Sequence, residues 1–260
     1  MRAILAASFL FLYFPIVALI AFSFNNSKRN INWRGFTLKY YEKAFANEAL
    51  HDAFINSMIV ASISTLVSTV LGAMLGILLY RFRFPLKGAY EGMVHLPIVI
   101  PEVCMGVALL AFFAAIKMPL GLTTITVSHI AFTIPFVAVV IRARMAGFDR
   151  SLEEAACDLG AGQWQVMRDI TLPYLKPGLI AGAMLAFTLS LDDFVITFFT
   201  SGPGSTTFPI KIYSMVRFSV TPEVNAASTL LIVLTLGLTV VAMWVQSRGD
   251  GGAGARKEGA

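Results

Sequence analysis

Residues 53–80 read AFINSMIVASISTLVSTVLGAMLGILLY and contain no Asp, Glu, Lys or Arg. A helix that crosses the hydrocarbon core of a bilayer needs about 20 mainly apolar residues. The requirement arises because lipid offers the peptide backbone no hydrogen-bond partners, so the chain must satisfy its own polar groups. This stretch is long and apolar enough to do so. It therefore predicts a transmembrane helix.

The same pattern recurs along the rest of the chain. Similar stretches cover residues 3–24, 92–116, 122–141, 178–200 and 224–246. The composition agrees, since 57% of the residues are hydrophobic and 13% are charged, whereas soluble domains carry about 25% charged residues. The chain is therefore predicted to be an all-α membrane protein with six transmembrane helices. This composition excludes an ordinary soluble enzyme.

The first apolar stretch has two interpretations. Arg2 precedes it, as a basic residue precedes the apolar region of a secretory signal peptide. Its uncharged run extends from Ala3 to Ser27, which is longer than the 7–15 apolar residues of such a peptide. The length favours a retained first helix. Residues 1–52 then form this helix and an outer segment, and residues 53–248 form the main membrane unit.

Orientation follows from the Lys and Arg residues in the connections, which are enriched on the cytoplasmic side of membranes. With the N-terminus inside, 12 of the 20 Lys and Arg residues fall in cytoplasmic segments. Both termini are therefore expected in the cytoplasm. The Gly-rich tail, residues 249–260, has little to bury and is expected to be disordered.

The polar connection at residues 142–177 has helical signals of its own. Ser151 and Glu154 stand at the spacing of a capping box, in which each side chain bonds the other residue's backbone amide. Glu153, Glu154 and Asp158 favour the positive end of a short helix, and Gly160 can end it in the left-handed conformation. A second helical piece, about residues 163–170, is expected to stop before Pro173, with Pro177 at the entry of the fifth span.

The apolar residues of this short helix share one face. Leu152, Ala155, Ala156 and Leu159 are spaced at i, i+3, i+4 and i+7. Such a stripe fits two structures: a connector that lies on the membrane surface, and a helix offered to a groove on a partner protein.

A family resemblance bears on this choice. The sequence Glu154-Ala155-Ala156, then Gly160 after three residues, then Ile170-Thr171-Leu172-Pro173 after nine, resembles the EAA pattern of ABC importer permeases. The resemblance implies a type I importer permease fold for roughly residues 53–246, with the first helix added. It also implies that the connection holds coupling helices that dock on a separate ATPase subunit. The implied docking residues are Ser151, Glu153, Glu154, Ala155, Ala156, Asp158, Leu159 and Gly160.

Within that family, three segments resemble the permeases of spermidine and putrescine importers. They are residues 96–102, LPIVIPE, residues 187–194, FTLSLDDF, and residues 209–217, PIKIYSMVR. The resemblance implies a multi-pass protein of the bacterial inner membrane that forms half of a pathway for polyamines. The implied partners are a second homologous permease subunit, two ATPase subunits, an outer polyamine-binding protein and membrane lipid, without nucleic acid.

The chain has no nucleotide-binding motif of its own. The pair Gly-Lys does not occur, so a phosphate-binding loop of the type G-x-x-x-x-G-K-[ST] is absent from the sequence. We expect no cofactor in this chain, with ATP and magnesium held by the ATPase partner. No catalytic constellation and no metal-ligand spacing is evident, and the two Cys residues lie far apart.

Charged side chains inside the predicted spans mark the candidate solute pathway, because burying them in lipid is costly. They are Glu102, Asp192 and Asp193, and Ser190 adds a hydroxyl. Successive helical residues point about 100° apart, so the two aspartates cannot both face a lumen, and one is expected to bond a neighbouring helix or subunit. A purely structural pairing of these carboxylates is the alternative. Pro97 and Pro101 are expected to break or kink the third span.

Two further features have structural interpretations. Gly72-x-x-x-Gly76 predicts a close-packing face on the second span. His129 in the fourth span is interpreted as a satisfied interior histidine.

Other functions remain possible on this sequence. They are an ABC permease for another small solute, an ATP-independent secondary transporter or channel, and a membrane-embedded enzyme. A secondary transporter is expected to show paired internal repeats with broken helices, which the sequence does not show. Its spans also hold no Lys or Arg to attract an anionic solute.

Overall fold

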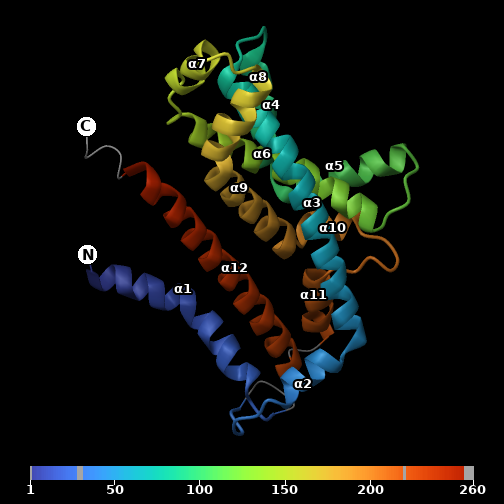
Figure 1. Cartoon of the computed structure of the whole chain (residues 1–260). Coiled ribbons are helices and arrows are strands. Elements are labelled where there is room, and N and C mark those ends of the chain that lie inside the picture. Colours follow the sequence, from blue (N-terminus) through green and yellow to red (C-terminus); the bar gives the residue numbers. More distant parts are fainter. Residues whose placement is uncertain (1, 28–31, 219–220, 255–260) are drawn as a thin grey trace. The chain divides into compact units, whose positions relative to one another are not determined.

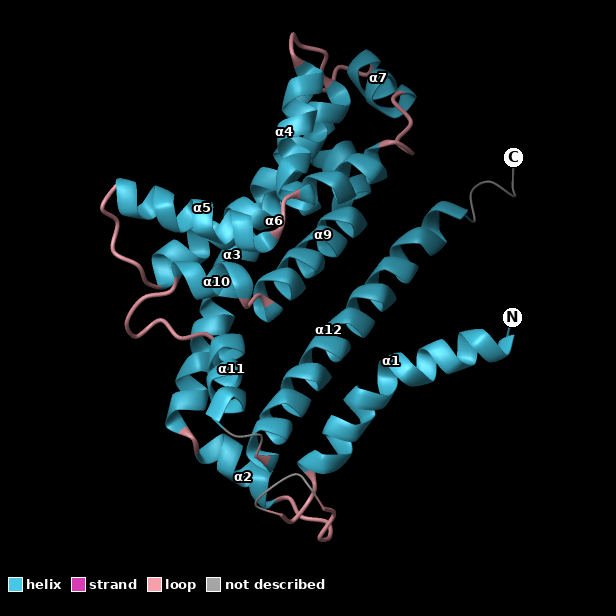
Figure 2. Cartoon of the chain, turned by 180° about the vertical axis from the view of Figure 1, so that it is seen from behind, coloured by secondary structure: helices cyan, strands magenta, loops and turns pink. Residues whose placement is uncertain are grey.

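A computed structural model describes residues 2–27, 32–218 and 221–254, and they are almost entirely helical (Figures 1 and 2). In these residues the only strand-like pairing is one isolated antiparallel bridge between Asn25 and Phe36. The all-α prediction is therefore confirmed for the described part of the chain. The helices, in chain order, are α1 (Arg2–Ser23), α2 (Lys39–Ala46), α3 (Glu48–Arg81), α4 (Lys87–Val99), α5 (Glu102–Ala115), α6 (Leu122–Met145), α7 (Ser151–Asp158), α8 (Gln163–Val166), the π-helix η1 (Met167–Thr171), α9 (Leu172–Asp192), α10 (Val195–Thr200), α11 (Phe208–Phe218) and α12 (Pro222–Gly254).

The long helices match the predicted spans in place. Within the described residues, four helical stretches are long and apolar enough to cross a membrane, or five if the bent pair α4–α5 counts as one span. The described apolar part of α1, residues 7–23, is shorter than these. The count of six spans and the side of the membrane on which the termini lie therefore stay predictions.

The chain divides into two compact units. One contains residues 1–57 and 205–237, and the other contains residues 58–204 and 238–260. In the first unit, Ala44, Leu50, Phe208 and Ala227 form a small apolar core. The Ser57 hydroxyl accepts a hydrogen bond from the Phe208 amide at 2.8 Å, which ties the start of α11 to α3.

In the second unit, α6 is the central helix. Its residues Val137, Ile141 and Met145 are buried in a core that also contains Ala73 and Leu175. More than half of its apolar window is buried, the largest share among the candidate spans of the described chain. The helices that flank α6 therefore determine how the unit is packed.

Glycines bring α3 and α9 close to α6. A Cβ atom at Gly72 would lie 2.6 Å from Val137 Cβ, and one at Gly76 would lie 2.8 Å from the Ala138 carbonyl oxygen. Gly182 of α9 approaches Val137 from another side, with a Cβ distance of 3.2 Å to Val137 Cγ1. Small residues let helix backbones approach closely in membranes. The predicted packing face at Gly72 and Gly76 is confirmed.

Two predicted spans are broken, one as expected and one not. The third bends by 107° between α4 and α5, at Ile100 and Pro101, which confirms the expected break. Pro97 itself lies inside α4. The fifth was predicted as one span over residues 178–200, and this is wrong: α9 already begins at Leu172 and ends at Asp192, and a separate short helix, α10, follows.

The segment around Pro173 also differs from the prediction. The second helical piece does not stop before Pro173, because a π-helical turn at Met167–Thr171 leads directly into α9. Pro173 lies in the first turn of α9, directly after the π-helical turn, and the helical segment continues through it. Pro177 accordingly lies inside α9 rather than at its entry. At the other end of the chain, α12 is assigned to Gly254, within the tail expected to be disordered, and residues 255–260 of that tail lie outside the described residues.

Candidate functional site

The break between α9 and α10 is organised by Asp193. Its backbone is extended, with φ −62° and ψ 123°, so the helix cannot continue through it. Its carboxylate accepts hydrogen bonds from the Thr197 amide at 2.8 Å, the Thr197 hydroxyl at 2.7 Å and the Ile196 amide at 3.3 Å. These amides belong to the first turn of α10, where the helix offers them no carbonyl partner. Asp193 therefore ends one helix and supports the start of the next.

A buried histidine completes the surroundings of Asp193. His129 Nε2 of α6 lies 3.2 Å from Asp193 Oδ2 and 2.9 Å from the Thr197 hydroxyl. The relative exposure of His129 is 1% and that of Asp193 is 8%. His129 Nδ1 lies 2.7 Å from the Ser190 hydroxyl, which lies 3.0 Å from the Ser64 hydroxyl. The interpretation of His129 as a satisfied interior residue is confirmed.

We call Ser64, His129, Ser190, Asp193 and Thr197 the polar cluster. Its members come from α3, α6, α9 and the α10 segment, so one hydrogen-bonded group joins four elements of the second unit. Polar groups buried in an apolar interior are costly unless they are bonded, and every member of the cluster has a partner. The cluster can therefore hold these helices in one arrangement.

The four predicted pathway residues fall into two pairs. Ser190 and Asp193 are buried in the polar cluster, whereas Asp192 and Glu102 are exposed. Glu102 is the first residue of α5, directly after the bend at Pro101. Helices α5 and α10 pack closely, since a Cβ atom at Gly106 would lie 2.6 Å from the Phe199 ring. The Glu102 and Asp192 carboxylates are near enough to repel each other, so together they form an exposed anionic region.

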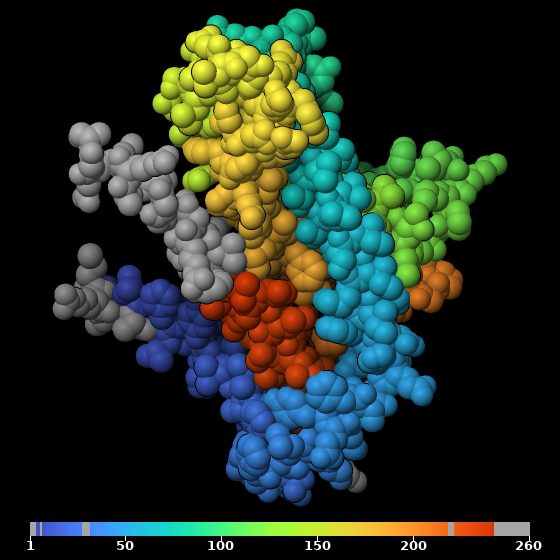
Figure 3. Space-filling model, in the orientation of Figure 1, coloured from blue at the N-terminus to red at the C-terminus, as the bar shows by residue number. Residues whose placement is uncertain are grey.

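The second candidate region is the α6–α9 loop, residues 146–171, which contains α7, α8 and η1. Figure 3 shows the side chains of α7 and α8, in yellow, at the molecular surface. Gly160 has φ +87° and ends the first of these helices, as predicted. The predicted capping box is wrong, because Ser151 is the first residue of α7 and makes no side-chain cap. Asp149 caps the helix instead. Its carboxylate accepts a hydrogen bond from the Ser151 amide at 3.0 Å, and this bond lowers the pKa of Asp149.

The apolar stripe of α7 faces outward. Leu159 is 90% exposed and Leu152 is 53% exposed, and Glu154 and Asp158 are exposed beside them. Glu153 differs from its neighbours. The sequence groups it with the exposed docking residues, but in the structure its carboxylate points into the unit, 2.9 Å from an Arg81 guanidinium nitrogen.

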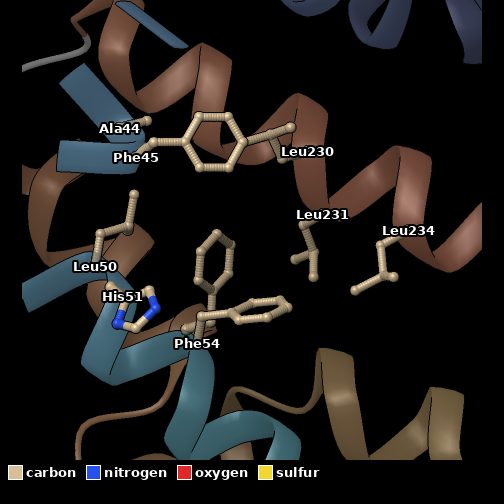
Figure 4. Close-up of a pocket in the computed structure, with 9 residues that line it drawn as sticks. Ala44, Phe45, Leu50, His51, Phe54, Leu230, Leu231 and Leu234 are labelled. Carbon is tan, nitrogen blue, oxygen red and sulfur yellow. The ribbon is translucent and has the colours of Figure 1, made fainter. Parts of the chain in front are cut away.

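An apolar pocket lies in the first unit. It has a volume of about 240 Å³ and is lined by residues of α2, α3, α11 and α12 (Figure 4). His51 is the one lining residue with a polar side chain, and the lining contains no carboxylate. The pocket therefore lacks the charge that would attract a small cation, and we do not assign the solute pathway to it.

Comparison with known proteins decides the family. The model of the "Binding-protein-dependent transport system inner membrane component" family matches residues 68–250. The chain belongs to this family. The match runs from within α3 into α12, and it includes the α6–α9 loop and every residue of the polar cluster except Ser64. The predicted resemblance to ABC importer permeases is confirmed.

Individual relatives agree with the family model. The permease is 40% identical over 251 residues to the "Spermidine/putrescine transport system permease protein PotC" of Shigella flexneri, covering 95% of both chains. It is 39% identical over 254 residues to the "Putrescine transport system permease protein PotI" of Escherichia coli strain K12, covering 95% of this chain and 90% of that one. Among solved structures, a bacterial ABC transporter for alginate import matches with a TM-score of 0.71 at 19% identity, over 96% of this chain and 94% of that one. That likeness confirms the permease fold.

The sequence did not reveal three participants in these sites. The role of His129 in holding Asp193, and those of Arg81 and Thr171 in holding Glu153, depend on contacts between residues far apart in the chain. A usable signal existed only for His129. A buried carboxylate needs a partner, and this histidine is the one ionisable residue in the fourth predicted span.

Proposed function

We propose that this permease forms half of the pathway of a bacterial importer for polyamines such as spermidine and putrescine. The observation that carries the proposal is the near-complete match to PotC, at 40% identity over 95% of both chains. The chemistry of the exposed carboxylates supports it. A polyamine carries separated ammonium groups, and each is stabilised by a nearby carboxylate.

Asp192 and Glu102 are the groups that we assign to the solute. Both are exposed, and their mutual repulsion would be relieved by a bound cation. Phe198 of α10, the helix that packs against α5, is 53% exposed and offers a ring face for a cation–π contact. Ser190 and Asp193 would contribute indirectly, because the polar cluster fixes the end of α9 where Asp192 stands.

The α6–α9 loop is the surface that we assign to the ATPase partner. Its exposed apolar stripe, flanked by Glu154 and Asp158, is suited to a groove on another protein. The complete importer would contain this chain in the bacterial inner membrane, a second homologous permease subunit, two ATPase subunits that hold ATP and magnesium, and an outer polyamine-binding protein. Docking at the loop and at the outer face would bias inward- and outward-facing states differently.

Uptake in cells tests the substrate. The permease is co-expressed with its partner subunits in a bacterium that lacks polyamine uptake, and accumulation of radiolabelled putrescine and spermidine is measured. We expect uptake that unlabelled polyamines inhibit and that amino acids, molybdate and phosphate do not. Asp192→Asn combined with Glu102→Gln should lower uptake at least a hundredfold, whereas Asp52→Asn, an exposed carboxylate elsewhere on α3, should not.

Assembly is measured in parallel, by co-purification of the subunits through a tag on the ATPase. The proposed pathway residues are wrong if the double variant assembles and transports polyamines at the wild-type rate. The proposed substrate is wrong if the wild-type complex hydrolyses ATP but accumulates neither polyamine.

A further inference from the structure

Two consecutive residues at the end of α3 hold α7 of the α6–α9 loop. Arg81 Nη2 lies 2.9 Å from Glu153 Oε2, and Arg81 Nη1 donates to Glu153 Oε1 at 3.2 Å, so the pair is bidentate. The Arg150 guanidinium, three residues earlier in the loop, lies 5.5 Å from the centre of the Tyr80 ring. Both contacts connect the end of α3 to the start of α7. Arg150 and Glu153 are three residues apart, so they lie on the same face of the helical turn.

Glu153 also reaches the base of α9. The Thr171 hydroxyl donates a hydrogen bond to Glu153 Oε1 at 2.6 Å, and Thr171 is the last residue of the π-helix that leads into α9. Glu153 is thus held by α3 on one side and by the start of α9 on the other. We call Arg81, Glu153 and Thr171 the clamp.

Burial distinguishes Glu153 of the clamp from its neighbour Glu154. The side chain of Glu153 is 11% exposed and that of Arg81 is 34% exposed, whereas the adjacent Glu154 is exposed. A carboxylate in a largely dry position is destabilising unless it is paired and hydrogen-bonded. Here the carboxylate has three donors. These bonds engage the carboxylate within the chain, whereas Glu154 and Leu159 are exposed and would meet a docked partner.

The two helices joined by the clamp meet again at the polar cluster. Ser64 of α3 bonds Ser190 of α9 at 3.0 Å, and Asp192 follows Ser190 two residues later. In addition, α3 and α9 both pack against α6 through their glycines. A displacement of α7 at the clamp would therefore move α3 and α9 together. Helix α9 ends at the exposed Asp192, and α3 is bonded to α9 two residues before it.

We infer that Glu153 is a positioning residue that transmits motion of α7 through Arg81 and Thr171 into α3 and α9. The inference rests on the proposed docking of an ATPase at the α6–α9 loop and extends it. The ATPase contacts the outward face of α7, and Glu153 connects the opposite face to the membrane helices. Loss of this carboxylate leaves docking intact and disconnects ATP hydrolysis from transport.

Glu153→Gln, with Asp52→Asn as its control, tests the inference in the complete complex, reconstituted in lipid vesicles with the binding protein. Three quantities are measured: co-purification of the ATPase, ATP hydrolysed, and labelled spermidine transported per ATP. We expect Glu153→Gln to retain the ATPase and to lower spermidine transported per ATP at least tenfold. Asp52→Asn, which changes an exposed carboxylate of α3 outside the docking surface, should keep that ratio within twofold of wild type. Arg81→Met should reproduce the effect from the other side of the bond.

Hydrogen exchange of the α7 amides in the same complex reports the clamp directly. Exchange should be at least tenfold faster in Glu153→Gln and close to wild type in Asp52→Asn. The reversed pair, Arg81→Glu with Glu153→Arg, should restore both exchange and the transport ratio to within threefold.

Two results would overturn the inference. Unchanged exchange in Glu153→Gln would mean that the carboxylate does not hold α7, and faster exchange with an unchanged transport ratio would mean that the clamp is only structural. Failure of the proposed function would give a different result. The wild-type complex would then transport no spermidine, while the exchange comparison would still show whether Glu153 holds the loop.

Discussion

Removal of His129 is the sharpest test of the polar cluster. His129→Ala leaves Asp193 buried without its histidine partner and removes one of the two contacts of Ser190. Leaving a buried polar group without its hydrogen-bond partner costs about 1–3 kcal/mol, and more where the group is charged. Asp193 keeps its bonds to Thr197 and Ile196, so a cost of about 3 kcal/mol is expected. For a chain of this size, 1 kcal/mol shifts the melting temperature by about 2–4 °C, which predicts a loss of about 6–12 °C.

The assay is thermal unfolding of the purified permease in detergent, followed by circular dichroism. His95→Ala is the matched control, because His95 is exposed and its Nδ1 lies 2.6 Å from the Glu91 carbonyl oxygen of its own helix. That variant should melt within 2 °C of wild type. A double variant, His129→Ala with Asp193→Asn, should be at least about 1 kcal/mol more stable than the sum of the single effects, since the uncompensated charge is gone.

Two outcomes would contradict this account of the cluster. A loss below 2 °C for His129→Ala would show that Asp193 does not depend on the histidine. Strict additivity in the double variant would show that the two side chains do not interact, whatever each contributes alone.

Three further predictions concern packing and the α6–α9 loop. Gly72→Val should lower stability by about 1–3 kcal/mol, measured by thermal unfolding, because its Cβ would lie 2.6 Å from Val137; Gly92→Val, where nothing lies within 4 Å, should not. Asp149→Ala should speed hydrogen exchange of the α7 amides several-fold. In the wild type, the protection from Asp149 should be complete above the ordinary carboxyl pKa of about 4 and lost only as pH falls through its lowered pKa; an unchanged pH profile in Asp149→Ala would contradict this. Glu154→Lys should reduce co-purification of the ATPase at least tenfold, since it reverses an exposed charge on the proposed docking face; normal recovery would exclude that role.

The long helices could be predicted from sequence because the requirement for them is compositional. An uncharged apolar run such as residues 122–141 satisfies the rule for a membrane helix without knowledge of its neighbours. The bend at Pro101 and the packing at Gly72 were equally accessible, since a missing amide hydrogen and a missing side chain act locally.

The end of α9 could not be located in this way. Nothing in the run FTLSLDDF identifies Asp193 as the stop, because its conformation depends on His129 in another helix. The cap of α7 presented a different difficulty. Asp149 and Ser151 are both good capping residues two positions apart, so the sequence pattern alone does not show which of them caps the helix.

The two pairs of consecutive acidic residues follow one rule. In Asp192-Asp193 and in Glu153-Glu154, one carboxylate is buried and bonded while its neighbour is exposed. In α7 successive residues diverge by about 100°, and at Asp193 the extended backbone turns its side chain away from that of Asp192. Bonding the buried member therefore sets the direction in which the other points. The buried residues therefore control the exposed ones without touching a solute or partner. It follows that loss of uptake in an Asp193 variant cannot by itself identify a solute ligand, and that Asp192→Asn, with the melting temperature preserved, is the substitution that can.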